Sequence, residues 1–249
     1  MKKKSVECFH EAPYASGKHT PYFDVYDSLF ERFIDKEIVF LEIGVLNGGS
    51  LFMWRSFFGP KARIIGVDLN PEVEKWIEHG FEIHIGSQAD PNFWSELMAE
   101  IGQVDIILDD GGHTYLQQIT TTECLLDSVK DDGLLVVEDT HTSYMSGFGN
   151  LNTSFIAYSK RWVDKINTRF GRFDDAQAQE DRRVWSIEFF ESIVAFKVNR
   201  PAANLRSEKI WNHRPEHMAL DFRDHPENLS SEESHQRGKL LSDAFKLYK

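Results

Sequence analysis

Along most of the chain, short apolar runs typical of buried strands alternate with segments whose apolar residues have helical spacing. Apolar runs with the length and composition of buried strands occur at 38–43, 63–68, 81–85, 105–108 and 134–137. Segments with helical spacing of apolar residues lie between them, at 50–58, 73–79, 92–101 and 115–129. This alternation predicts an α/β fold, built on a single doubly wound and mostly parallel sheet.

The flanking segments follow other patterns. Helical spacing predicts an amphipathic helix over 23–34 and another over 152–169. Trp185–Val198 contains two apolar runs joined at Phe190-Glu191-Ser192, which predicts an antiparallel hairpin at one edge of the sheet. We therefore expect an N-terminal arm over 1–20, one domain over 21–200, and a tail over 201–249. The tail is expected to act as a lid or as a contact in a homo-oligomer, with a terminal helix over 238–247.

Composition and charge narrow the classes of protein. The 249 residues are 41% hydrophobic and 27% charged, with a formal net charge of −12. Basic residues are scattered, so nucleic acid is not an expected partner, and an acidic surface disfavours anionic membranes. No run approaches the roughly 18 apolar residues of a membrane span, and the first residues lack the apolar core of a signal peptide. Two cysteines, Cys8 and Cys124, favour a reducing, cytoplasmic compartment.

Two acidic segments directly follow apolar runs. The first is Asp109-Asp110-Gly111-Gly112-His113, and the second is Glu138-Asp139-Thr140-His141. The carboxyl ends of parallel strands meet at one edge of the sheet, where ligands bind, and neighbouring strands lie about 5 Å apart. If these strands are neighbours, their acids can converge on one cation, and His113 is close enough to move a proton. A set of carboxylates without cysteine suits Mg²⁺, Ca²⁺ or Mn²⁺ better than Zn²⁺.

The first three strands end in residues that suit a nucleoside. Glu42-Ile43-Gly44 leads through Gly48 to Ser50, a glycine turn that lets a ligand approach the backbone. Asp68, after the second strand, can accept hydrogen bonds from ribose hydroxyls. The third strand ends in a polar cluster that includes Ser87 and Gln88. Glu42 would repel a pyrophosphate but favour an amino or sulfonium group, and this combination describes S-adenosylmethionine.

Together, these motifs resemble class I S-adenosylmethionine methyltransferases. More narrowly, Glu42-Ile43-Gly44, Asp68, Asp109–His113 and Glu138–Tyr144 resemble the metal-dependent sugar O-methyltransferases of macrolide biosynthesis and the related group of rhamnosyl O-methyltransferases and cephalosporin hydroxylases. The resemblance implies a seven-strand sheet whose last strand is antiparallel. It also implies Mg²⁺ (or Mn²⁺) held by Asp110, Glu138 and Asp139, with His113 as the base. Asp109 and Tyr22 are assigned to the donor site, Tyr22 near the amino-acid end of the donor.

The sequence departs from this family at two points. The family often has Asp-Gly-Ser-His where this chain has Gly112 before His113, a change expected to affect the stiffness of the loop more than its chemistry. The macrolide-type enzyme also carries an additional N-terminal domain, for which 249 residues leave no room, so a different acceptor is expected.

The predicted function is therefore metal-dependent O-methyl transfer to a hydroxyl of a sugar or sugar-containing metabolite, a small and glycosylated acceptor. Two alternatives stay open. One is a nicotinamide-dependent oxidoreductase, which Asp68 allows but the missing G-x-G-x-x-G and Glu42 oppose. The other is a non-catalytic nucleoside-binding protein, which the clustered acids and the histidine disfavour.

Overall fold

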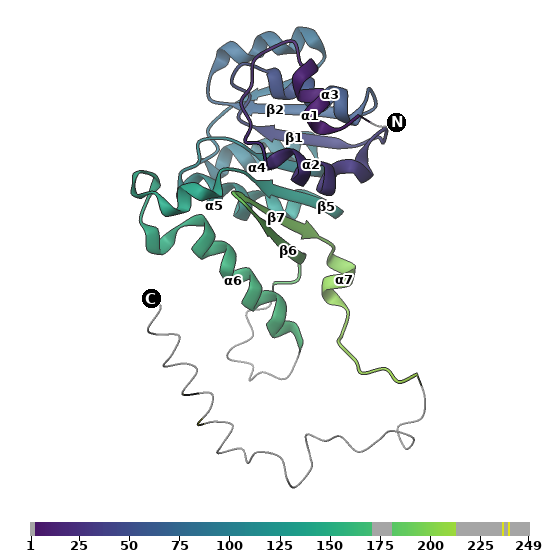
Figure 1. Ribbon diagram of the computed structural model, residues 1–249, viewed down its shortest axis with the longest axis vertical. Coiled ribbons are helices and arrows are strands. Elements are labelled where there is room, and N and C mark those ends of the chain that lie inside the picture. Colours follow the sequence, from purple (N-terminus) through teal and green to yellow (C-terminus); the bar gives the residue numbers. More distant parts are fainter. Residues whose placement is uncertain (1–2, 171–180, 213–235, 237–238, 240–249) are drawn as a thin grey trace. The chain divides into compact units, whose positions relative to one another are not determined.

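The computed structural model describes residues 3–170 and 181–212, together with Gln236 and Lys239 (Figure 1). It divides into two compact units, Met1–Ser207 and Glu208–Lys249. The first unit contains the sheet and the helices α1–α7. The predicted helix over 238–247 and most of the predicted tail lie outside the described residues.

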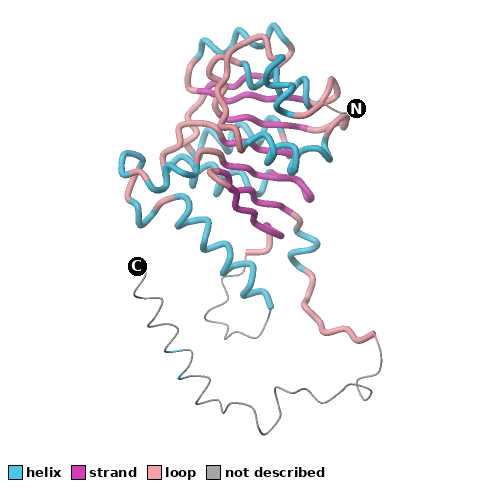
Figure 2. Tube along the Cα trace, in the orientation of Figure 1, coloured by secondary structure: helices cyan, strands magenta, loops and turns pink. Residues whose placement is uncertain are grey.

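A seven-stranded sheet forms the centre of the first unit, with the strand order β3-β2-β1-β4-β5-β7-β6. The first five strands run parallel, and β7 is antiparallel to both β5 and β6 (Figure 2). The predicted doubly wound sheet with an antiparallel edge hairpin is therefore confirmed. The strands are β1 (Val39–Ile43), β2 (Arg63–Asp68), β3 (Glu82–Ile85), β4 (Val104–Asp109), β5 (Val129–Val137), β6 (Val184–Phe190) and β7 (Ile193–Val198).

Helices cover both faces of this sheet (Figure 1). One face carries α1 (Ser5–Glu11), α2 (Tyr22–Phe30) and α3 (Gly49–Phe58), and the other carries α4 (Pro91–Ile101), α5 (Tyr115–Leu125) and α6 (Phe155–Asn167). A short helix, α7 (Arg200–Asn204), follows β7. The 3₁₀ segments are Glu31–Phe33, Pro71–His79, Leu126–Ser128, Thr140–Tyr144, Ser146–Phe148, Leu151–Thr153 and Thr168–Phe170.

The alternation of side chains along the strands divides the core into two clusters. Phe40 of β1 packs with Trp54 and Phe58 of α3 on one face. Leu41, the next residue of β1, belongs to the cluster on the other face, which includes Trp162 of α6. Since both faces are covered by helices, the inner strands are apolar at consecutive positions, which is why short continuous apolar runs predicted them correctly.

Two local structures differ from the prediction. The arm over 1–20 contains α1, because Ser5 is buried and both its backbone nitrogen and its hydroxyl bond to the chain at α2, through Asp27 and Phe23. Strand β5 begins at Val129, ahead of the predicted start at residue 134, and its register with β4 shifts between Val104 and Ile106. A separate result is that no helix among the described residues is both long and apolar enough to cross a membrane.

Candidate active site

A cavity of about 540 Å³ opens at the carboxyl ends of the parallel strands. Its wall includes the loops after β1, β2, β3 and β4, and also the segment 15–18 before α2. The predicted residues that line it are Gly44, Ser50, Asp68, Gln88, Asp110, His113 and Asp139. The parallel register that aligns Ile43 with Asp109, and Asp109 with Val137, brings these loops together at one edge. Seven of the residues predicted from the strand ends therefore lie in the wall of one cavity.

Gly44 sits where the loops after β1 and β4 approach each other most closely. Its φ of 92° lies in the left-handed region, and a Cβ at this position would be 2.1 Å from the carbonyl oxygen of Asp110. The amide of Asp110 donates to the carbonyl of Ile43 at 2.9 Å. Only glycine fits here, because any side chain would push Asp110 away from the end of β1.

Asp68 lines the cavity and also shapes its glycine loop. Its Oδ2 atom accepts hydrogen bonds from the amides of Val45 and Leu46, at 2.8 and 2.9 Å. Its Oδ1 atom accepts one from Asn70 at 2.9 Å. The carboxylate therefore stabilises the turn after β1, and it still presents its edge to the cavity, where the sequence predicted a contact with ribose.

Glu42 is completely buried and, in the described part of the chain, lies behind the cavity wall rather than in it. Its carboxylate accepts hydrogen bonds from the Ser50 hydroxyl and the Trp54 indole, both at 2.9 Å. Ser50, which does line the cavity, lies between Glu42 and the cavity. Burial raises the pKa of Glu42 to about 7, although the nearby ammonium of Lys18 opposes that shift. Glu42, which the sequence predicted to contact a positively charged donor, is therefore separated from the cavity by Ser50.

The raised pKa of Glu42 makes a prediction about stability. A carboxyl whose pKa rises from 4.5 to about 7 on folding stabilises the protein fully below pH 4.5, and that contribution is lost as the pH rises toward 7. Glu42→Gln does not ionise; its amide oxygen can accept from the Trp54 indole, and its amide nitrogen can donate to the Ser50 hydroxyl, which reverses that bond. We expect the unfolding free energy of the variant, relative to the wild type, to increase by about 2–3 kcal/mol between pH 5 and pH 8. Urea denaturation across this range measures it; a difference independent of pH would contradict it.

Gln88 connects the loops after β3 and β4. Its amide nitrogen donates to Asp109 at 2.9 Å and to Thr121 at 3.1 Å, and its amide oxygen accepts from the Gly112 nitrogen at 2.8 Å. Asp109 is 1% exposed, and burial raises its pKa to about 6. Its carboxylate also accepts from the Gly111 nitrogen at 3.2 Å. Asp109 therefore braces the loop that carries Asp110, instead of reaching the donor as the sequence predicted.

Gly48 and Ser87, which were also predicted to contact the donor, make other contacts in the structure. A Cβ on Gly48 would lie 2.4 Å from the Trp76 ring, so this glycine allows the ring to pack and does not line the cavity among the described residues. Ser87 accepts a hydrogen bond from the Ala89 nitrogen at 3.3 Å and turns the chain toward Gln88. Neither residue is among the described residues that line the cavity.

One group of side chains at the end of the cavity brings three potential metal-ligating residues close together. Ligand atoms of Asp110, His113 and Asp139 all lie within 4.8 Å of one another. The Nε2 atom of His113 is 3.3 Å from Asp139 Oδ2. Both residues have left-handed backbones, with φ of 59° and 53°, conformations that cost energy in residues other than glycine and that cluster at functional sites. The buried Nδ1 atom of His113 has no hydrogen-bond partner in the described residues.

Glu138, the third predicted metal ligand, is held apart from this group. Its Oε1 atom accepts a hydrogen bond from Tyr26 at 2.6 Å, and its Oε2 atom pairs with the Lys18 ammonium at 2.9 Å. Burial raises the pKa of Glu138 to about 8, against the opposing charge of Lys18. Lys18 also pairs with Asp110 at 2.6 Å, so an ammonium joins two of the three predicted ligands.

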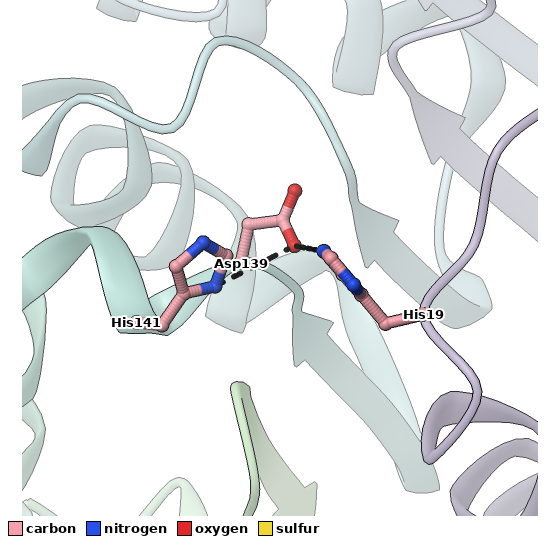
Figure 3. Close-up of side chains that lie close together, drawn as sticks. All are labelled: His19, Asp139 and His141. Carbon is pink, nitrogen blue, oxygen red and sulfur yellow. Dashed lines mark ion pairs between the residues drawn. The ribbon is translucent and has the colours of Figure 1, made fainter.

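Besides His113, the carboxylate of Asp139 also lies close to two other histidines, His19 and His141. Its Oδ1 atom lies 3.9 Å from His19 Nε2 and 3.8 Å from His141 Nδ1, and the three side chains converge in Figure 3. The same oxygen accepts a hydrogen bond from the Tyr22 hydroxyl, whose oxygen in turn accepts one from the Ser192 hydroxyl at 2.8 Å. His141 Nδ1 contacts the Ser192 hydroxyl. Tyr22 thus positions Asp139, and within the described residues it does not line the cavity, contrary to its predicted place in the donor site.

Three contributors to this site were missed by the sequence analysis: Lys18, Tyr26 and Ser192. Lys18 and Tyr26 precede β1 and reach acids that follow β4 and β5, and Ser192 comes from the turn between β6 and β7. The sequence contains only a weak indication of these contacts. Tyr22 and Tyr26 lie four residues apart, hence on one helix face, but no pattern shows that this face meets Glu138.

The chain is similar in sequence and in fold to known methyltransferases. Residues 41–140 match the Methyltransf_24 family model, described as a methyltransferase domain. Among solved structures, the MycE methyltransferase of the mycinamycin pathway, in complex with Mg and SAH, superposes with a TM-score of 0.75 and 26% identity. The match covers 86% of this chain and 57% of MycE.

Two curated proteins with similar sequences are named as O-methyltransferases. The chain is 32% identical over 195 residues to 8-demethyl-8-alpha-L-rhamnosyl tetracenomycin-C 2'-O-methyltransferase of Streptomyces olivaceus, covering 72% of this chain and 50% of the relative. It is 36% identical over 135 residues to mycinamicin VI 2''-O-methyltransferase of Micromonospora griseorubida, covering 50% and 32% respectively. The resemblance predicted from the motifs is thus confirmed, and the chain spans about a third to a half of the curated relatives' length.

Proposed function

We propose that this protein transfers a methyl group from S-adenosylmethionine to a hydroxyl on the sugar of a glycosylated acceptor, with the help of a divalent metal. The observation that carries the proposal is the convergence of Asp110, His113 and Asp139 at one end of a cavity whose other end has a glycine loop and Asp68. The relatives, named as sugar O-methyltransferases, and the MycE complex with Mg, SAH and mycinamycin VI support the same class.

The residues at the end of the cavity fit a magnesium or manganese ion. Asp110 and Asp139 offer hard carboxylate oxygens close together, which such ions prefer, and Glu138 is the predicted third acid. Two of these acids pair with the buried ammonium of Lys18, which supports a site that binds positive charge. When bound, the ion would supply charge that lowers the pKa of a substrate hydroxyl and helps to orient the acceptor.

His113 is placed to take the proton of the acceptor hydroxyl. It lines the cavity, and its Nε2 atom lies 3.3 Å from Asp139 Oδ2, so this carboxylate orients the ring for general-base catalysis. The oxygen then attacks the methyl group, forming an O–CH₃ bond as the S–CH₃ bond breaks. The positive charge of the sulfonium and the negative charge of the oxygen disappear together, so alignment in the cavity supplies much of the catalysis.

The donor is expected to lie across the cavity along the ends of β1 to β4. Gly44 lets it approach the backbone, and Asp68 is the predicted ribose contact. Exposed Leu46 and Leu69, which flank Asp68 in the cavity wall, offer apolar contact to an adenine ring. Ser50, itself bonded to Glu42, can face the polar end of the donor.

Removal of the metal tests this proposal. We expect turnover of glycosides with free vicinal hydroxyls to fall by at least about a hundredfold in EDTA, because a catalytic metal contributes several kcal/mol. Added Mg²⁺ or Mn²⁺ should restore it. Transfer of a labelled methyl group from S-adenosylmethionine is measured, and calorimetry with NAD is run beside it. Turnover unaffected by EDTA would refute the metal's role, and NAD binding without S-adenosylmethionine binding would refute the donor.

A further inference from the structure

Lys18 is the buried cation of this site. Its Nζ atom lies 2.6 Å from Asp110 Oδ2 and 2.9 Å from Glu138 Oε2, and its side chain is 2% exposed. Both acids belong to the proposed metal ligands. A buried ammonium with two carboxylate partners cannot be removed without leaving charge uncompensated, so Lys18 stabilises these acids in the absence of any other cation.

The oxygens that Lys18 contacts are those that a divalent ion would also seek. Glu138 has one oxygen bonded to Tyr26 and the other to Lys18, so the carboxylate has no oxygen free of protein contacts. A metal that binds Glu138 together with Asp110 therefore meets the ammonium directly. Two positive charges that share the same carboxylate oxygens repel each other strongly even at an effective dielectric constant of about 20.

Lys18 also terminates a segment that borders the donor cavity, here called the 14–18 strap (residues 14–18). Its beginning is fixed: the Tyr14 ring packs 4.4 Å from the Trp76 ring, and the carbonyls of Tyr14 and Ala15 lie so close to Gly49 that a Cβ there would be 2.3 and 2.7 Å from them. Its middle is open, because a Cβ on Gly17 would meet no described atom within 4 Å. The end of the strap is held by the ion pairs of Lys18.

We propose that Lys18 is an internal cation that competes with the divalent metal for Asp110 and Glu138, and that metal loading releases Lys18 and with it the end of the 14–18 strap. The inference rests on the proposed metal site. It makes Lys18 a residue that sets metal affinity, and it couples the metal site to the donor cavity, since Ala15, Ser16 and Gly17 line that cavity.

A pair of lysine variants tests the competition. Lys18→Met removes the ammonium, and the control Lys130→Met removes a lysine that pairs with Asp105 at 2.7 Å, at the opposite end of β4. Mg²⁺ is titrated calorimetrically into each protein without donor. We expect Lys18→Met to bind Mg²⁺ at least about tenfold more tightly than the wild type. Its melting temperature in EDTA should be lower than that of the wild type and should recover with Mg²⁺, whereas Lys130→Met should bind Mg²⁺ like the wild type.

Equal or weaker Mg²⁺ binding by Lys18→Met would overturn the competition while leaving the proposed function standing. Absence of Mg²⁺ binding in every protein would refute both. A measurement on the wild type covers the case in which the variant does not fold: an amine-reactive reagent, followed by peptide mass spectrometry, reports the accessibility of Lys18. We expect Lys18 to be protected in EDTA and labelled in Mg²⁺, with exposed Lys61 labelled in both. Protection of Lys18 in both conditions would overturn its release.

Discussion

Replacement of Asp110 by asparagine is expected to lower methyl transfer by at least about a thousandfold, while the affinity for S-adenosylmethionine changes no more than a few-fold. Asp110 is one of two carboxylates of the group that it forms with His113 and Asp139. Asparagine has the same shape but a neutral side chain, so it weakens the hold on a divalent ion that contributes several kcal/mol to catalysis. The backbone bond from Asp110 to Ile43 is unaffected, so the wall of the donor cavity should persist.

The measurements are turnover of a glycoside with free vicinal hydroxyls and calorimetric binding of the donor. Asp127→Asn is the matched control, because Asp127 is an exposed acid that pairs with Arg183 outside the cavity. The control should keep wild-type turnover and donor binding. Turnover of Asp110→Asn within about tenfold of the wild type would show that Asp110 does not hold the metal.

The layers of the fold could be predicted because burial on both faces leaves a direct trace in the sequence. Strands such as 63–68 and 105–108 are short apolar runs, and the helices between them have a different period. The antiparallel edge was visible as two apolar runs separated by Glu191-Ser192, too short a connection for a parallel crossover. The start of β5 was missed because residues 130–133 are polar or glycine, yet they continue the strand around a register shift.

The location of the site was predictable for a similar reason, but the directions of its side chains were not. Parallel strands present their carboxyl ends at one edge, so Asp68, Asp110 and Asp139 all reach the cavity. Glu42 and Phe40 are two residues apart on β1, so their side chains lie on the same face of the sheet. That face packs against α3, where Trp54 contacts both residues. From the sequence, Glu42 is only a carboxylate before a glycine turn. The packing of α3 is what brings this carboxylate against Trp54 and Ser50.

The residues that contact the acids from distant parts of the chain could not be predicted from sequence patterns. Lys18 and Tyr26 lie 120 and 112 residues from Glu138, and Ser192 lies 170 residues from Tyr22. Such pairs leave no periodicity, since each depends on how α2 and the hairpin dock onto the sheet. They change the interpretation of the site, because the three predicted ligands are not equivalent. Asp110 and Asp139 approach each other, while Glu138 is committed to Lys18 and Tyr26.

Replacement of His113 by asparagine is expected to lower kcat by about 10²–10⁴-fold, the usual contribution of a general base, with Mg²⁺ and donor affinities within a few-fold of the wild type. His113 has a left-handed φ of 59°, which asparagine tolerates better than most residues, so the loop should keep its conformation. Single-turnover kinetics and calorimetry measure these quantities. His84→Asn is the control, because His84 contacts Glu82 on β3 outside the cavity wall, and it should leave turnover unchanged. A variant that retains kcat would refute the base, and one that loses Mg²⁺ affinity instead would identify His113 as a ligand of the metal, the other role that its distance to Asp110 and Asp139 allows.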